Sequence, residues 1–129
     1  MSEDLHQKFL GTWKLIGVER EVADSGAKLD ENVTQTGFIC YTNEPRMMVI
    51  IRRMEPGKPQ QITSYAGPWT IEDDAVIHHV EMATRETWVN VPQVRHFKFE
   101  GDKLILTPPV SEDYTHGAVT RRSLTWQKL

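Results

Sequence analysis

Several features that would point to common classes of protein are scarce in this chain of 129 residues. Cys40 is the single cysteine, so no disulfide can form within the chain, and a reducing compartment is expected. The longest apolar run, MMVII, is far shorter than a membrane span. The opening stretch MSEDLHQKFLG lacks the positive and apolar blocks of a secretion signal. We therefore expect a cytoplasmic protein without a membrane partner.

Positive charge is not in excess either. Lysine and arginine number 15 against 18 acidic residues, which gives a net charge of −3 and predicts no nucleic-acid partner. The glycine-containing stretches DSGAK and EPGKP lack the spacing of a phosphate-binding loop. Neighbouring histidines on a strand point to opposite faces, so HH at 78–79 does not predict a metal site. No cofactor is expected.

Helix signals are confined to the N-terminal stretch SEDLHQKFL, where Ser2 can cap a short helix. The rest of the chain reads as strands separated by turn residues. Eight strands are expected, at residues 12–22, 37–42, 46–53, 62–71, 75–82, 93–100, 103–107 and 118–129. An antiparallel set of this size without crossover helices closes most economically on itself, which removes its edges. Residues 1–129 are therefore expected to form a single all-β domain, an eight-stranded antiparallel up-and-down β-barrel with a short N-terminal helix.

Two short turns predict the register of the strands. A turn at residues 73–74 sets Trp69 opposite His78 and, continued along the strands, Tyr65 opposite Met82. A turn at residues 101–102 sets Phe97 opposite Leu106. Both pairings gather apolar residues on one face, as a barrel interior requires. His78 is therefore expected to point inward and His79 outward.

The chain also resembles a known family through an ordered series of motifs. GTWKLIGVE, with Gly11 and Trp13, is similar to the G-x-W signature that opens the first strand of lipocalins. GFICYTNEPRMMV, SYAGPWTIEDDAVIHHVE, QVRHFKFEGDKLILTPP and a terminal LTWQK follow in order. The whole series resembles the small stand-alone bacterial and fungal lipocalin-like domain proteins, which are calycin-type barrels. The resemblance implies a barrel closed at one end by the N-terminal helix, a cavity for a small ligand, and an arginine of the last strand, Arg121 or Arg122, over Trp13.

The predicted interior holds aromatic residues and a few polar ones. The expected ligand-binding set consists of Tyr41, Tyr65, Trp69, His78, Val80, Met82, Gln93, Arg95 and Phe97. Apolar walls with a few fixed polar groups are typical of a ligand pocket, although a packed core with satisfied polar groups has the same composition. For the aromatic residues alone, packing is the favoured interpretation.

Arg95 and His78 each have two interpretations. A guanidinium inside a barrel is either an anchor for an anionic ligand group or a residue near the mouth with its head in water. Arg95 would need a carboxylate partner from the first strand, where Glu19 is expected to share a face with Trp13. His78 is either a core histidine hydrogen-bonded to Tyr65, a backbone carbonyl or water, or a proton-transfer residue.

Three functional hypotheses follow. The leading hypothesis is a binding protein for a small, largely apolar or amphipathic molecule that carries a polar or anionic group. The alternative is a small cofactor-free isomerase, cyclase or lyase with His78 and Arg95 as catalytic residues. The third is a homodimer formed by an outer strand face, which Ile77, Val94 and Ile105 would make apolar.

Overall fold

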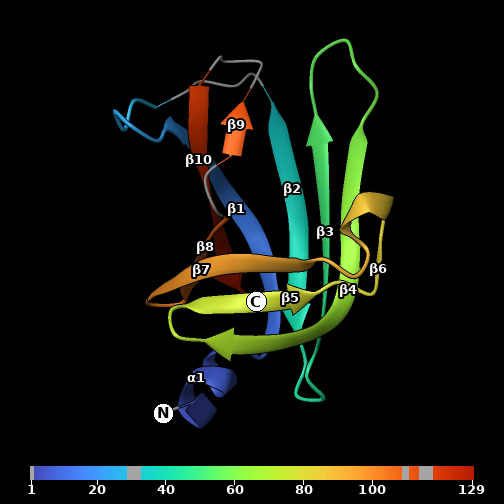
Figure 1. Cartoon of the computed structure of the whole chain (residues 1–129), viewed down its shortest axis with the longest axis vertical. Coiled ribbons are helices and arrows are strands. Elements are labelled where there is room, and N and C mark those ends of the chain that lie inside the picture. The colour runs from blue at the N-terminus through green and yellow to red at the C-terminus, as the bar shows by residue number, and fades with distance from the viewer. Residues whose placement is uncertain (1, 29–32, 109–110, 114–117) are drawn as a thin grey trace.

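Eight antiparallel strands close into a barrel in the computed structural model, which describes residues 2–28, 33–108, 111–113 and 118–129 (Figure 1). The ring is formed by β1 (Gly11–Val22), β2 (Thr34–Tyr41), β3 (Arg46–Met54), β4 (Gln61–Glu72), β5 (Ala75–His79), β7 (Pro92–Glu100), β8 (Lys103–Thr107) and β10 (Ala118–Lys128). Pairing of β1 with β10 closes the ring. Two short segments lie beside it: β6 (Met82–Ala83) pairs with β4, and β9 (Ser111–Asp113) pairs with β10. The expected fold is confirmed.

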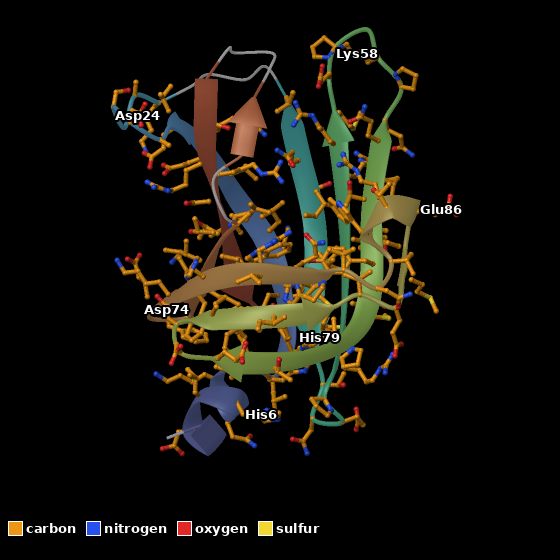
Figure 2. All side chains as sticks on the ribbon, in the orientation of Figure 1. His6, Asp24, Lys58, Asp74, His79 and Glu86 are labelled. Atoms are coloured by element: carbon orange, nitrogen blue, oxygen red, sulfur yellow. The ribbon has the colours of Figure 1, made fainter. Side chains whose placement is uncertain are left out.

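The N-terminal helix α1 (Ser2–Phe9) lies at one end of the barrel, at the bottom of Figure 1. Phe9 is fully buried and belongs to the core cluster of the barrel, so its ring occupies this end of the interior. His6 also lies on the barrel side of the helix, where its ring stacks on Trp69 at 4.6 Å between centroids (Figure 2). Within the described residues, no helix combines the length and the apolar character needed to cross a membrane.

Both turns that the sequence predicts are present. Trp69 pairs with His78 across the β4–β5 hairpin, in which Asp73 has a φ of 52°, the left-handed backbone that two-residue hairpin turns use. Phe97 pairs with Leu106 across the β7–β8 hairpin. The inward direction of His78 is confirmed by an exposed fraction of 1%.

Two irregularities in the strands reverse the faces that simple alternation predicts. The register of β1 shifts between Leu15 and Gly17, so that Glu19 lies outside the barrel, where it forms an ion pair with Lys28. The expectation that Glu19 supplies a carboxylate to the interior is therefore wrong. A β-bulge of this kind inserts one residue and turns every following side chain to the opposite face.

The second irregularity separates β5 from β6. Met82 pairs with Ala66 instead of Tyr65, and its side chain is 66% exposed on the outer face. The expected position of Met82 inside the barrel is therefore wrong. Gly67 explains the distortion, because a Cβ at this position would lie 1.8 Å from the carbonyl oxygen of His79. The missing side chain lets the bulging backbone approach β4 closely.

An apolar patch of the outer surface lies on strands other than those that the sequence suggested. Ile77 is 9% exposed, so the expected surface of Ile77, Val94 and Ile105 lacks its central apolar side chain. Phe38, Met48 and Ile50 are each at least 47% exposed on β2 and β3. Together with Met82 they border an apolar hollow of about 590 Å³. The homodimer itself stays a prediction.

Candidate functional site

A small cavity lies inside the barrel among polar and apolar side chains. Its volume is about 60 Å³. Tyr65, His78, Arg95 and Arg122 are among its polar lining residues. Its apolar lining includes Ile39, Val49, Leu106, Leu124 and Trp126. This combination of apolar walls and a few polar groups is the one expected of a ligand site.

Aromatic packing fills the barrel between this cavity and α1. The ring of Phe9 lies within 5.0–5.5 Å, between centroids, of four other rings, those of Tyr41, Trp69, Phe97 and Phe99. The indole nitrogen of Trp69 donates to the carbonyl oxygen of Thr42 at 3.1 Å. Trp69 and Phe97 therefore serve the core at this end, as the packing interpretation of the aromatic residues predicted.

His78 is held between two tyrosines. The hydroxyl of Tyr41 lies 2.7 Å from Nε2, and the hydroxyl of Tyr65 lies 2.7 Å from Nδ1. A neutral imidazole has one N–H and one lone pair, so it donates to one hydroxyl and accepts from the other. Both ring nitrogens are thus engaged, one by a tyrosine of β2 and the other by a tyrosine of the adjacent strand β4. The Tyr65 partner is the one that the core interpretation of His78 expected.

The electrostatics of this trio keep it neutral. Burial of the ring lowers the pKa of His78 to about 3, and electrostatic interaction with Arg95 and His79 adds to this effect. Burial raises the pKa of Tyr41 well above its usual value. Burial also raises the pKa of Tyr65, although Arg95 opposes that shift. At neutral pH the trio therefore consists of an uncharged imidazole and two uncharged phenols.

Arg95 brings a permanent charge to the cavity. It lies on β7 opposite Val76, with its side chain partly buried. Its guanidinium donates to the carbonyl oxygen of Val94 at 3.0 Å and to Oε1 of Gln93 at 3.3 Å. These contacts use two of the five N–H groups that an arginine offers. The guanidinium is thus fixed in the interior by its own strand.

Val80 packs in the core, and the neighbouring His79 lies on the outer face. Val80 is 3% exposed and belongs to the core cluster. His79 points outward, and its Nε2 lies 2.8 Å from the hydroxyl of Thr70. Figure 2 shows His79 on β5 and Asp74 at the tip of the β4–β5 hairpin. Among the described residues, no group of three or more His, Cys, Asp or Glu side chains could hold a metal ion.

The signature at the start of β1 differs in one respect from what the resemblance implies. Gly11 opens β1, and the indole nitrogen of the buried Trp13 donates to the carbonyl oxygen of Phe9 at 2.9 Å. The cation over its ring is Lys128, with Nζ 4.8 Å from the ring centroid. The expected role of Arg122 over Trp13 is wrong, because the register places Trp13 opposite Lys128.

Trp88 is a cavity residue that sequence reasoning missed. It lies on the 3₁₀ turn η1 (Glu86–Trp88), in the link between β6 and β7, and its ring centroid is 5.8 Å from that of Tyr65. The guanidinium of Arg85 lies 4.9 Å from the centroid of the same ring. A tryptophan in the mostly polar stretch TRETWVN was the available signal, because tryptophan is highly buried on average.

Comparisons with known proteins identify the family. No curated protein matches the sequence. The family model described as a lipocalin-like domain matches residues 57–129, the part of the chain from the loop before β4 to the C-terminus. This stretch supplies His78 and Arg95 and the strands that carry them. The chain belongs to the lipocalin-like domain family.

Proposed function

We propose that this protein binds a small amphipathic molecule inside the barrel, with the polar or anionic end of the molecule at Arg95. A lipocalin-like barrel fits small-molecule binding in general. The single observation that carries the proposal is the presence of a fixed guanidinium in a cavity whose other walls are largely apolar. The partly buried guanidinium of Arg95 keeps N–H groups beyond its two described hydrogen bonds, and a ligand oxygen would accept from them.

The size of the cavity limits what enters it. About 60 Å³ is well below the roughly 300–1,000 Å³ of pockets that enclose drug-sized molecules. The part of the ligand inside the barrel is therefore small, such as a carboxylate with two or three carbons. A longer apolar portion would have to extend toward the barrel end opposite α1.

The hydrogen bonds and the pKa of His78 fit a binding role better than a catalytic role. An isomerase or cyclase would need a ring nitrogen directed at the substrate, with a pKa near the working pH. Both ring nitrogens of His78 are engaged by tyrosine hydroxyls, and its pKa of about 3 makes it a weak base. In this proposal the trio is a rigid polar wall that positions the ligand, and Arg95 interacts electrostatically with Tyr65, Tyr41 and His78.

The proposal is tested by filling the cavity. Propanoate and the neutral propanamide are titrated into the ¹⁵N-labelled protein, and binding is measured from backbone NMR shifts. Leu106→Phe enlarges a cavity residue and is expected to abolish binding of both probes. The matched control is Ile105→Phe, because Ile105 is the neighbouring residue of β8 and faces the other way. Equal binding by both variants, or no saturable binding by the wild type, would reject the proposal.

A further inference from the structure

The hydroxyl of Tyr41 depends on His78 for its hydrogen bond. Tyr41 is 1% exposed, and the rings of Phe9 and Trp69 each lie 5.1 Å from its own ring, between centroids. Within the described residues, its hydroxyl has one hydrogen-bond partner, Nε2 of His78 at 2.7 Å. An unpaired O–H donor in the core would carry the full cost of its desolvation. The O–H group of Tyr41 therefore donates to Nε2.

The tautomer of His78 follows from this bond. The neutral imidazole carries one proton on its two ring nitrogens, so an accepting Nε2 leaves that proton on Nδ1. Nδ1 then donates to the hydroxyl oxygen of Tyr65, which is 2.7 Å away. The opposite tautomer would reverse both bonds and would leave the O–H group of Tyr41 unpaired among aromatic rings. Burial of Tyr41 therefore favours the proton on Nδ1.

This arrangement leaves the hydroxyl hydrogen of Tyr65 without an acceptor from the protein. The oxygen of Tyr65 accepts from Nδ1, and the nearby Arg95 can only donate. Within the described part of the chain, no hydrogen bond gives the O–H group of Tyr65 a second acceptor. Tyr65 lines the interior cavity, whereas Tyr41 is not among the described residues that line it. The unpaired O–H group thus belongs to the tyrosine that a ligand can reach.

Arg95 restricts the ligand in the same direction. It lines the same cavity of about 60 Å³, and it opposes the rise in the pKa of Tyr65 that burial causes. A guanidinium has donors and no acceptor, so a ligand atom between Arg95 and Tyr65 would meet donors from both residues. A carboxylate or carbonyl oxygen has two lone pairs and accepts from both, whereas an ammonium group cannot accept at all.

We propose that Tyr65 donates its hydroxyl hydrogen to an oxygen of the ligand, and that Tyr41 fixes this direction through His78. The inference rests on the proposed function and narrows its ligand class to small molecules whose buried end is a carboxylate or a carbonyl group. Tyr65 is a ligand contact in this account. Tyr41 and His78 are positioning residues, because they act through the hydroxyl of Tyr65.

The first measurement is the tautomer of His78 in the ligand-free wild type at neutral pH. Protonated and unprotonated ring nitrogens give separate signals in a long-range ¹H–¹⁵N spectrum, and His78→Gln identifies the signals of His78. The expected result is a protonated Nδ1 and an unprotonated Nε2. A proton on Nε2 would overturn the inference, because Tyr65 would then donate to Nδ1 and would have no hydrogen for a ligand.

The second measurement compares the loss of two hydroxyl groups from β4. Tyr65→Phe removes the proposed ligand contact, whereas Thr70→Val removes a hydroxyl that faces outward beside His79. Dissociation constants are measured for propanoate and propanamide. Tyr65→Phe is expected to weaken propanoate binding by about 10- to 100-fold and propanamide binding by about 2- to 10-fold, because a hydrogen bond to a charged acceptor is the stronger one. Thr70→Val is expected to change neither.

The outcomes separate this inference from the proposed function. Unchanged affinities in Tyr65→Phe would overturn the ligand contact and leave binding in the cavity intact. Absence of saturable binding by the wild type would reject the proposed function and the ligand contact with it, whereas the tautomer of His78 is measured without any ligand. Where Tyr65→Phe does not fold, the tautomer in the wild type decides the inference.

Discussion

The hydroxyl of Tyr65 lies 2.7 Å from Nδ1 of His78, in the interior of the barrel. The two residues lie on neighbouring strands, with Tyr65 on β4 and His78 on β5. The hydrogen bond satisfies a ring nitrogen that solvent cannot reach, because His78 is 1% exposed. It joins the cavity wall to the core, since Tyr41 bonds to the opposite nitrogen of the same ring.

Tyr65→Phe removes this bond without changing the shape of the ring. The buried Nδ1 then lacks its partner, and the free energy of unfolding is expected to fall by about 1–3 kcal/mol. Urea denaturation measures the change. Thr70→Val is the control, because Thr70 lies on the same strand and contacts the outward His79. A smaller loss, within about 1 kcal/mol, is expected there, and equal losses in the two variants would count against a special role of the buried bond.

The buried His78 predicts how stability depends on pH. Its folded pKa of about 3 lies below the unfolded value of about 6.5. Between these values the unfolded state binds more protons than the folded state. The free energy of unfolding therefore falls as the pH falls from about 6.5 toward 3. His78 contributes up to about 1.4 kcal/mol per pH unit to this fall, and it contributes no slope above about pH 6.5.

His78→Gln is expected to remove this slope between pH 6.5 and 5, the part of the window above the usual range of carboxyl titration. His79→Gln, at the neighbouring outward position, is expected to retain it. Urea denaturation at closely spaced pH values gives the slopes. A curve for His78→Gln that runs parallel to the wild-type curve would show that the ring titrates in the folded protein.

Gly67 of β4 is expected to resist replacement by any larger residue. An added Cβ would meet the carbonyl oxygen of His79 at 1.8 Å, so the backbone between β5 and β6 would have to move. Gly67→Ala should lower the free energy of unfolding by roughly 2–4 kcal/mol. Gly17→Ala is the control, because its Cβ would meet only the Cβ of Thr125 at 4.0 Å. Similar urea midpoints for the two variants would contradict the close approach.

Lys128 is expected to stabilise the signature at the start of β1. Its ammonium lies 4.8 Å from the ring centroid of Trp13 and donates to the carbonyl oxygen of Leu10. Lys128→Met should lower the free energy of unfolding by about 1–2 kcal/mol, measured by thermal or urea denaturation. Lys14→Met, on the exposed face of the same strand pair, should change it by less than about 0.5 kcal/mol. An unchanged free energy of unfolding in Lys128→Met would show that the cation–π contact has no energetic role.

The sequence predicted the parts of the fold that depend on local signals. The turns at residues 73–74 and 101–102 determined which residues pair, and the apolar alternation determined that His78 points inward. The errors at Glu19 and Met82 have a common physical cause. Each follows a point where one strand gains a residue, and such a bulge depends on close contacts between strands that a periodic pattern does not contain.

The candidate site was predicted in part for the same reason. The two predicted hairpins placed Tyr65, His78 and Arg95 on the inner face, and all three line the cavity. Arg122 was assigned to Trp13 because the resemblance supplied a role, whereas its position depends on the register of β1 against β10. Trp88 lies in the irregular link after β6, where alternation of faces has no meaning.

The most direct test of a carboxylate site in the barrel is an NMR titration of the arginine side chains. Propanoate is added to ¹⁵N-labelled protein, and the Nε–H signals are followed after assignment by single substitutions. The account predicts a saturable shift at Arg95, with none at Arg121 or at Arg46, which is paired with Glu81 on the outer face. Shifts confined to the outer arginines, or no saturable shift at Arg95, would contradict it.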